Sequence, residues 1–272
     1  MSIKVDLKGK VAVITGGAGV LCSCMAKALA EQGVKVAILD LKKQEIERVV
    51  QKIRSSGGEA IGVEADVLNK ESLVRARDVI IENYKTVDIL INGAGGNHPQ
   101  ATTGPESPFF DLTVDGIQKV LNLNFMGTLL PSQVFGKIMA EKKKGTIINI
   151  SSMAAYTPLT RTVAYSAAKA AVSNFTQWLA VHFNQEYSTE IRVNAIAPGF
   201  ILTNQNRYLL IDEKTGEPTQ RGRQILNMTP MGRYGSPEDL VGLILFLCSD
   251  ASSFINGAVI PVDGGFLAYS GV

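Results

Sequence analysis

The residues best suited to do chemistry are a serine, a tyrosine and a lysine that lie close together in the sequence. Ser152 precedes Tyr165 by thirteen residues, and Tyr165 opens the pentapeptide Tyr-Ser-Ala-Ala-Lys that ends at Lys169. A free tyrosine has a pKa near ~10, so it exchanges protons poorly at neutral pH unless its phenolate is stabilised. The Ala-rich stretch 163–183 holds neither Pro nor Gly and predicts a helix, on which residues four apart share a face.

We therefore expect Lys169 to stand beside Tyr165 and to lower its pKa. Ser152, at the end of an expected strand, is placed to hydrogen-bond the same substrate oxygen. A tyrosine and a lysine four apart on a helix also occur by chance, so the pair indicates a catalytic site only if the surrounding strands and helices place it at a ligand-binding edge.

Those elements follow a regular alternation of strands and helices. Seven short β-branched runs predict strands that begin near residues 11, 35, 60, 88, 146, 191 and 258. The helices expected between and after them cover about 19–33, 42–56, 70–84, 113–143, 163–186 and 236–250. Apolar strands separated by helices form a parallel sheet covered on both sides. We predict a single α/β domain over residues 1–272, a Rossmann-type doubly wound parallel seven-stranded sheet with helices on both faces.

Two segments are longer than ordinary connectors, and both follow expected strands. The first covers about 95–112 and contains three prolines; the second covers 199–235 and is polar. Long loops at the ligand edge of a rigid sheet commonly carry specificity, so we expect them to contact the substrate.

Composition excludes several classes of function. A formal charge of +2 over 272 residues offers no basic surface for nucleic acid. No apolar run approaches the ~18 residues of a membrane span, and the first residues lack the apolar core of a secretion signal, so we expect a cytoplasmic protein without membrane contact. Three cysteines and two histidines without ligand spacing predict no metal site.

The first strand runs into the segment Thr15-Gly16-Gly17-Ala18-Gly19 and then a helix. Glycines in such a turn let the backbone approach a pyrophosphate, which the N–H groups of the helix start stabilise. Asp40 ends the second strand, where a carboxylate accepts hydrogen bonds from both adenosine ribose hydroxyls and repels a 2′-phosphate. NAD is therefore favoured over NADP. Lys42 and Lys43 keep the alternative of a 2′-phosphate open, and for Asp66 a role at a helix start is equally open.

Taken together, these residues resemble the short-chain dehydrogenase/reductase family from Lys8 to the C-terminus. The motifs that carry the resemblance are Thr15-Gly16 with its glycine turn, Asp66, Asn92-Gly93-Ala94-Gly95, Asn124 in Asn-Phe-Met-Gly, Ser152, Tyr165 with Lys169, Pro198-Gly199 with Thr203, and Asp263-Gly264-Gly265. The resemblance implies a catalytic tetrad of Asn124, Ser152, Tyr165 and Lys169. It also implies a nicotinamide cofactor held by Gly16, Gly17, Gly19, Val20, Leu21, Asp40, Asp66, Val67, Asn92, Gly93, Ala94, Gly95, Tyr165, Lys169, Pro198, Gly199, Ile201 and Thr203.

By this resemblance each tetrad residue has a role. Tyr165 would exchange a proton with the substrate oxygen, which Ser152 polarises, and Lys169 would hold the nicotinamide ribose. Asn124 would position a water that relays protons to solvent. Thr203 and the backbone of Ile201 would orient the nicotinamide carboxamide.

One departure from the family pattern concerns the glycine turn. The family reads Thr-Gly-x-x-x-Gly-x-Gly, whereas Val20 and Cys22 stand at the last two glycine positions and Gly19 comes one place early. Cys22 adds a side chain where the family packs helix against strand, so we expect weaker cofactor binding. A redox thiol and a buried structural cysteine are both open for Cys22, the second being favoured.

Within the family, the resemblance is greatest to the short-chain type of D-mannonate oxidoreductase, also called D-fructuronate reductase. It lies in the segments 91–103, 151–183, 197–210 and 262–272. It implies reversible hydride transfer between NADH and C5 of fructuronate, and dimers or tetramers as the assembly. A gluconate 5-dehydrogenase-like activity on another polyol or keto-acid is the alternative. A third possibility, from a different class, is an NAD-binding sensor or scaffold without catalysis.

A hexuronate needs a cation for its carboxylate and polar groups for its hydroxyls. Polar candidates for these contacts lie on the segments that face Tyr165, and they are Asn97, His98, Arg161, Asn204 and Arg207. We expect the two arginines to bind the carboxylate; a surface or intersubunit ion pair is the alternative for each. For His98, a hydrogen bond that caps its own loop is an equal alternative.

Overall fold

The computed structural model describes residues 5–203 and 206–271. It forms one seven-stranded sheet in the order β3-β2-β1-β4-β5-β6-β7, and every neighbouring pair is parallel. The strands are β1(Val11–Thr15), β2(Lys35–Asp40), β3(Glu59–Glu64), β4(Ile89–Asn92), β5(Gly145–Ile150), β6(Ile191–Pro198) and β7(Val259–Val262). All seven predicted strands are present, and the Rossmann-type fold is confirmed.

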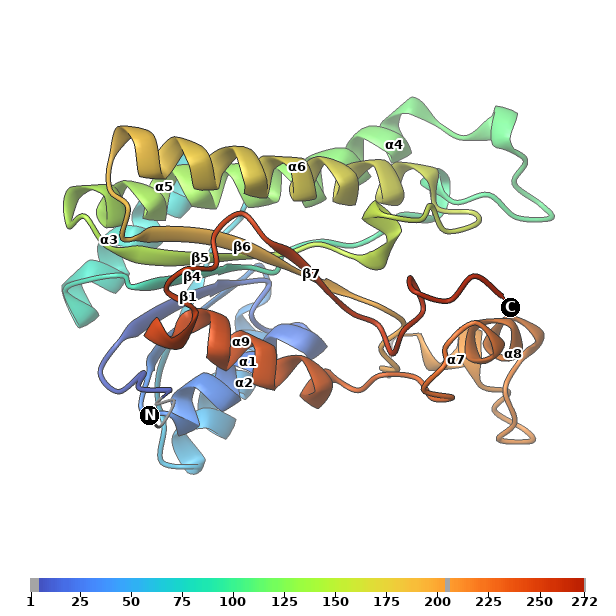
Figure 1. Ribbon diagram of the computed structural model, residues 1–272, viewed down its shortest axis with the longest axis horizontal. Coiled ribbons are helices and arrows are strands. Elements are labelled where there is room, and N and C mark those ends of the chain that lie inside the picture. Colours follow the sequence, from blue (N-terminus) through green and yellow to red (C-terminus); the bar gives the residue numbers. More distant parts are fainter. Residues whose placement is uncertain (1–4, 204–205, 272) are drawn as a thin grey trace.

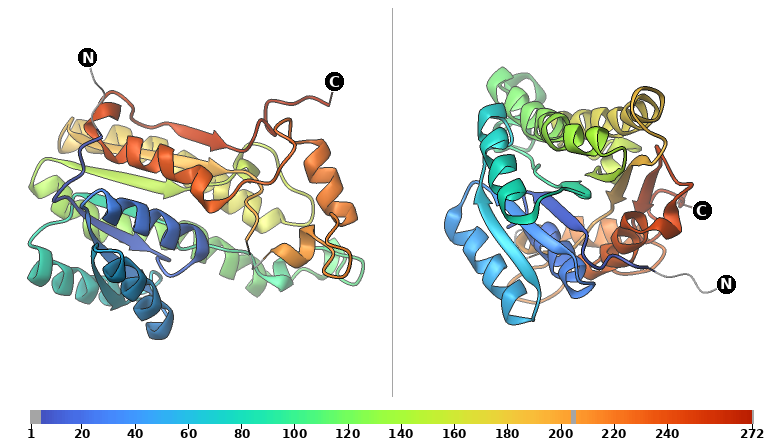
Figure 2. Two further views of the ribbon diagram at one scale, coloured as in Figure 1. Left: turned by 90° about the horizontal axis from the view of Figure 1, so that it is seen from below. Right: turned by 90° about the vertical axis from the view of Figure 1, so that its left-hand side faces the viewer.

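Helices cover both faces of the sheet (Figure 1). One face carries α1(Val20–Glu31), α2(Lys43–Ser55) and α9(Val241–Cys248). The other carries α3(Lys70–Tyr84), α4(Val114–Leu121), α5(Gly127–Glu141) and α6(Val163–Glu186). The two layers are clear in the right-hand view of Figure 2. The helices of each layer pack their apolar side chains against one face of the sheet and form a separate buried cluster there. Strands β1, β2 and β4 are therefore buried on both faces. No helix within these residues is long and apolar enough to cross a membrane.

The helix predicted over 113–143 is interrupted. A π-helical turn, η3(Asn122–Met126), separates α4 from α5. The Asn124 amide donates to the carbonyl of Val120 at 2.8 Å, so a side chain competes with the backbone for that acceptor. Such insertions produce π-turns, which are frequent at functional sites. The helix expected over 236–250 also differs, because η5(Pro237–Leu240) precedes α9.

The two long segments are partly helical. The first holds the short turns η1(Pro99–Ala101) and η2(Phe109–Asp111), and the second holds α7(Arg207–Leu210) and α8(Gln220–Asn227). Helix α8 begins at Thr219, whose hydroxyl accepts from the backbone N–H of Gly222 at 3.0 Å. Residues 199–235 therefore differ from the expected loop, because they contain two helices, of which α8 is capped by Thr219.

Candidate active site

The predicted catalytic residues meet at the carboxyl ends of the central strands. The strand order reverses between β1 and β4, the position where doubly wound sheets bind ligands. Ser152 follows β5, and Tyr165 and Lys169 lie in the first two turns of α6. A pocket of about 300 Å³ opens here, lined by Val20, Leu21, Ile150, Ser151, Ser152, Tyr165, Pro198, Gly199, Phe200, Ile201, Thr203 and Asn206. The structure thus joins the start of α1, the tyrosine and the segment after β6 around one space.

Burial controls the ionisation of Tyr165 and Lys169. Desolvation raises the pKa of Tyr165, and a hydrogen bond with the Ser152 side chain opposes this rise. Desolvation also lowers the pKa of Lys169 to about 8. The Lys169 Nζ lies 5.6 Å from the centroid of the Tyr165 ring and donates to the carbonyl of Ile150 at 2.7 Å. The expectation that Lys169 lowers the Tyr165 pKa is not met in the protein alone, because desolvation raises this pKa and the hydrogen bond with Ser152 is what opposes the rise.

Asn124, the fourth residue of the expected tetrad, closely approaches Gly95. A Cβ on Gly95 would lie 2.7 Å from the Asn124 Oδ1 and 3.2 Å from the Lys169 Nζ. The buried Asn124 amide donates to the carbonyl of Gly96 at 2.7 Å, and its Oδ1 accepts from the Gly96 N–H at 3.2 Å. The π-turn therefore aims Asn124 at the backbone beside Lys169. Its role in positioning a water stays a prediction.

The glycine turn after β1 presents a cradle for a pyrophosphate. Gly16 has φ +59°, and a Cβ there would lie 2.8 Å from the Cα of Ala94, so the turn packs directly on the segment after β4. Thr15 holds that segment, since its Oγ1 accepts from the N–H groups of Gly93 at 3.2 Å and Ala94 at 3.4 Å. Helix α1 begins after Gly19 with no side-chain cap and no acidic residue in its first turn. Its N–H groups remain available to an anion, which fits the predicted cofactor site.

Asp40 lies beside this turn as expected. Its Oδ2 accepts from the backbone N–H of Ala18 at 3.1 Å, and its Oδ1 accepts from that of Leu41 at 2.8 Å. A carboxylate in this position suits the ribose hydroxyls and repels a 2′-phosphate. Lys43 forms an exposed ion pair with Glu47 at 4.0 Å, a role within α2.

Asp66 takes part in the turn that leads into α3. Its Oδ1 accepts from the N–H of Leu68 at 2.9 Å, and Asn69 caps the helix by accepting from Ser72. Asp66 thus holds the turn before α3, whereas the capping role that was its alternative belongs to Asn69. A contact of Asp66 with the cofactor stays a prediction.

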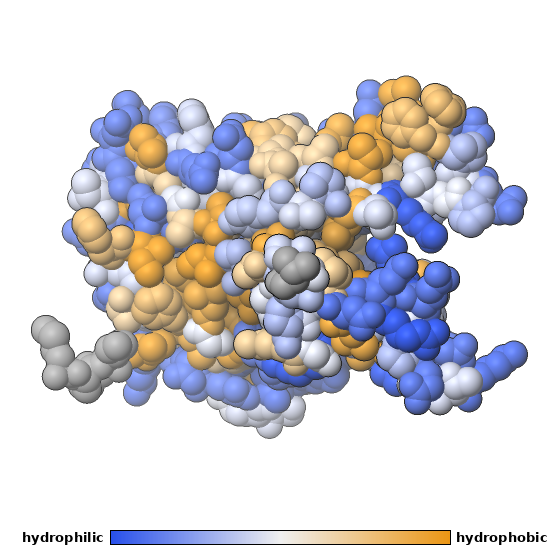
Figure 3. All heavy atoms as spheres, turned by 45° about the vertical axis from the view of Figure 1, so that its right-hand side comes forward, coloured by the Kyte–Doolittle hydropathy of each residue, from blue (hydrophilic) through white to orange (hydrophobic). Residues whose placement is uncertain are grey.

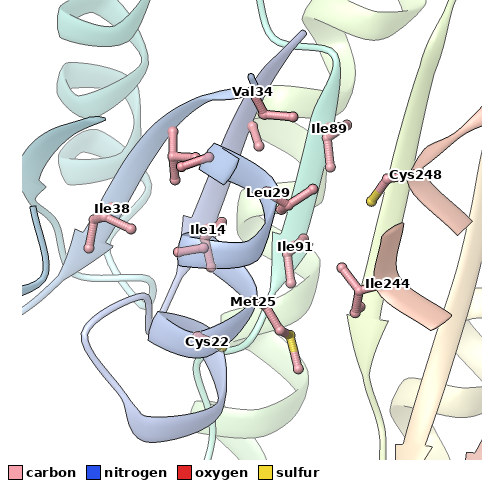
Figure 4. Close-up of a cluster of buried hydrophobic side chains, with 14 of the residues drawn as sticks. Ile14, Cys22, Met25, Leu29, Val34, Ile38, Ile89, Ile91, Ile244 and Cys248 are labelled. Atoms are coloured by element: carbon pink, nitrogen blue, oxygen red, sulfur yellow. The ribbon is translucent and has the colours of Figure 1, made fainter. Parts of the chain in front are cut away.

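Cys22 is a buried structural residue rather than a reactive thiol. It is 4% exposed and faces the sheet together with Met25 and Leu29 (Figure 4). Desolvation raises its pKa to about 12, so the thiolate needed for redox chemistry is not populated near neutral pH. A Cβ on Gly93 would overlap the Cys22 sulfur. The side chain that departs from the family pattern is accommodated because residue 93 has none.

The predicted substrate residues lie in different surroundings: some bond within their own loop and others are exposed. Asn97 donates to the Thr102 Oγ1 at 2.9 Å, and the His98 Nδ1 accepts from the Gln100 N–H at 3.3 Å, the loop-capping alternative. Arg207 is exposed at the first position of α7. Asn204 lies outside the described residues.

Arg161 is exposed and has φ +74°, a rare left-handed conformation for a residue with a side chain. Its carbonyl accepts from the N–H of Thr103 at 3.0 Å, which ties the loop before α6 to the segment after β4.

Two further residues were missed. Asn206 lines the pocket and binds Thr203, a contact that the spacing Thr-x-x-Asn could have suggested. Arg221 on α8 is half-buried; desolvation lowers its pKa, and the positive charge of Arg161 lowers it further. Only the fold brings these arginines near each other, so no local signal could have found Arg221.

The comparisons with known proteins identify the family. A family model described as enoyl-(acyl carrier protein) reductase matches residues 18–267. The protein belongs to the short-chain dehydrogenase/reductase family. An uncharacterised oxidoreductase of Bacillus subtilis (strain 168), UxuB, is 51% identical over 98% of each sequence.

Two further relatives bear on the cofactor and the substrate. A crystal structure of a candidate D-mannonate oxidoreductase from Haemophilus influenzae, with bound NAD, has a TM-score of 0.93 and 51% identity over 98% of each sequence. The 2-dehydro-3-deoxy-D-gluconate 5-dehydrogenase of Escherichia coli (strain K12) is 34% identical over 97% of each sequence. This protein is thus an oxidoreductase of the same family and fold.

Proposed function

We propose that the protein is an NAD-dependent oxidoreductase that transfers a hydride between nicotinamide and a sugar acid, specifically between NADH and C5 of D-fructuronate to give D-mannonate. The observation that carries the proposal is the pocket shared by Ser152, Tyr165, Thr203 and the start of α1. In this pocket the proposed proton donor, Tyr165, lies beside the residues expected to hold a nicotinamide. The relative solved with NAD is a guide to the cofactor.

The cofactor assignment is supported by the fit of the residues present. The uncapped start of α1 and the close approach of Gly16 to Ala94 suit a pyrophosphate, and Asp40 suits an unphosphorylated ribose. The bound cofactor would supply or accept the hydride. We assign to this site the eighteen cofactor residues predicted from the sequence, with NADP less favoured.

Proton transfer is assigned to the tetrad. Tyr165 donates a proton to the substrate oxygen during reduction, and its hydrogen bond with Ser152 stabilises the phenolate that remains. Lys169, whose pKa of about 8 makes it a proton exchanger near neutral pH, lies within one helical turn of Tyr165. Asn124 holds the backbone at Gly96, and the preceding Gly95 lies beside Lys169, where a water would connect the pair to solvent.

The substrate carboxylate is assigned to Arg161 and Arg221. Neither guanidinium has an ion-pair partner within residues 5–203 and 206–271, and the charge of Arg161 acts on Arg221. Two neighbouring cations without a carboxylate between them favour an anionic ligand. Figure 3 shows a hollow between the layer that carries α4 and the segment of α7 and α8, with hydrophilic side chains around it. Arg207, Asn97 and His98 remain candidates for other contacts of the sugar acid.

A gluconate 5-dehydrogenase-like activity is the second candidate. The name of the Escherichia coli relative gives a related sugar acid as its substrate. The carboxylate of such a substrate would need the same arginines in this protein. A sensor or scaffold without catalysis is less well supported, because such a role gives Ser152 and Tyr165 no reason to line one pocket, with the buried Lys169 one helical turn from Tyr165.

The direct test is oxidation of NADH, with NADPH alongside, when the purified protein meets D-fructuronate or 5-ketogluconate. Oxidation of NADH with fructuronate alone would support the specific proposal, and turnover with 5-ketogluconate alone would favour the second candidate. NADH binding without turnover of either compound would contradict both substrate proposals and leave the substrate to be identified.

The role of the two arginines is tested by comparing a substrate that carries a carboxylate with one that does not. For Arg161→Gln and Arg221→Gln we expect KM for fructuronate to rise by about 10- to 100-fold, the loss of one charged hydrogen bond. Activity on a neutral ketose should change little. Arg75→Gln, an exposed change on α3 far from the pocket, is the control. Equal KM effects of Arg75→Gln and Arg221→Gln would disprove the assignment.

We also propose that the protein works as one domain within a homodimer or homotetramer. The family resemblance suggests this assembly, and the groove between α5 and α6 exposes Trp178 at 57% together with neighbouring aromatic rings. Light scattering on the purified protein would give the subunit count, and a monomer would reject the proposal.

A further inference from the structure

The segment after β6 contains an asparagine, Asn206, whose side-chain oxygen and nitrogen both bond to residues before it. The Asn206 Oδ1 accepts from the backbone N–H of Thr203 at 2.8 Å and lies 3.2 Å from the Thr203 Oγ1. The Asn206 Nδ2 donates to the carbonyl of Ile201 at 2.8 Å. One side chain therefore joins the two residues that are assigned to the nicotinamide carboxamide.

These contacts determine the direction of each hydrogen bond. A backbone N–H can only donate and a backbone carbonyl can only accept, so the two backbone partners define which end of the Asn206 amide is oxygen. Since the Thr203 hydroxyl faces that oxygen, it must donate its single proton to Asn206. The remaining capacity of the Thr203 oxygen is as an acceptor.

The Asn206 side chain does not cap the helix that follows it. Asn206 precedes α7 as the N-cap residue, where asparagine usually accepts from the first N–H groups of the helix. Here its side chain makes no such cap and turns back to Thr203 and Ile201. Because Asn206 also lines the pocket of Ser152 and Tyr165, its side chain is held where it can act on a bound cofactor.

We propose that Asn206 is a positioning residue that holds the Thr203 hydroxyl as an acceptor for the amide N–H of the nicotinamide carboxamide. Asn206 thereby makes the site selective for a nicotinamide ring that carries a free amide. The inference rests on the proposed NAD site, and it adds a residue that acts on the cofactor only through Thr203.

Binding measurements without any sugar acid test this directly. We expect Asn206→Ala to weaken NADH binding by about two- to tenfold, the range for one neutral hydrogen bond, and to leave ADP-ribose, which lacks the nicotinamide, unaffected. The preference of the wild type for NADH over its reduced 3-acetylpyridine analogue, which has a methyl ketone in place of the amide, should shrink in the same variant. Asn227→Ala, an exposed change at the end of α8, is the control and should alter none of these affinities.

A second variant guards against a general loss of structure. Thr203→Val removes the hydroxyl, and combining it with Asn206→Ala should add no further loss of NADH affinity, because both changes interrupt the same contact. Equal weakening of ADP-ribose and NADH, or additive losses in the double variant, would overturn the inference. A wild type that binds NADH no better than ADP-ribose would instead reject the proposed nicotinamide site itself.

Discussion

The contact between Cys22 and Gly93 gives a prediction whose size follows from the structure. Cys22 fills space that a side chain at position 93 would need, so the two residues should be energetically coupled. We consider Cys22→Gly, Gly93→Ala and the double variant. Cys22→Gly restores the family's glycine, and Gly93→Ala adds the methyl group that the cysteine sulfur now excludes.

The single changes should each destabilise the fold. Cys22→Gly empties a site that is 4% exposed and puts glycine into the first turn of α1, at a combined cost of about 2–3 kcal/mol in the free energy of unfolding. Gly93→Ala drives a Cβ into the Cys22 sulfur and to 2.9 Å from the carbonyl of Thr15, an overpacking of about 1–3 kcal/mol. In the double variant the new methyl occupies space that the sulfur vacates, so we expect it to be about 1–2 kcal/mol more stable than the sum of the single changes. Full rescue is not expected, because the contact with Thr15 persists.

Urea unfolding followed by far-UV circular dichroism measures these free energies. Cys248 provides a matched control, since it is buried in the same apolar cluster but lies on α9 (Figure 4). Cys248→Gly combined with Gly93→Ala should be additive within about 0.5 kcal/mol. If the Cys22 pair is no more strongly coupled than this control, the explanation of how the turn accommodates the cysteine is wrong. NADH titration of Cys22→Gly also tests the expectation that the cysteine weakens cofactor binding, which predicts tighter binding in the variant.

Three further predictions concern the site. Tyr165→Phe should reduce turnover by about 10²- to 10⁴-fold while NADH fluorescence still reports binding; unchanged turnover would remove Tyr165 from the chemistry. The pKa of Lys169 falls from 10.5 to about 8 on folding, so the unfolded protein binds the extra proton between these values and stability should rise with pH across that window. Urea midpoints of wild type and Lys169→Met would show this, and an equal rise in both would refute it. Asp40→Ala should raise the affinity for NADPH relative to NADH, and an unchanged ratio in binding titrations would contradict the ribose role.

Patterns local in sequence identified the sheet and several helices. The bounds expected for the third and fifth helices agree with α3(Lys70–Tyr84) and α6(Val163–Glu186), because uninterrupted helix formers define them. The spacing of Tyr165 and Lys169 likewise needs only a helix to bring both to one face.

Other features depend on contacts between distant segments. The π-turn at Asn124 arises where the helix meets the backbone after β4, and burial, which only the packed fold sets, reverses the expected shift of the Tyr165 pKa. Sequence by itself determined the strands and the spacing of Tyr165 and Lys169, because these follow from short-range periodicity, while the proposed tetrad came from the family resemblance. Tertiary structure alone decided that Gly93 makes room for Cys22 and that Arg221 approaches Arg161, because each pair is joined by packing across the fold rather than by the residues between them.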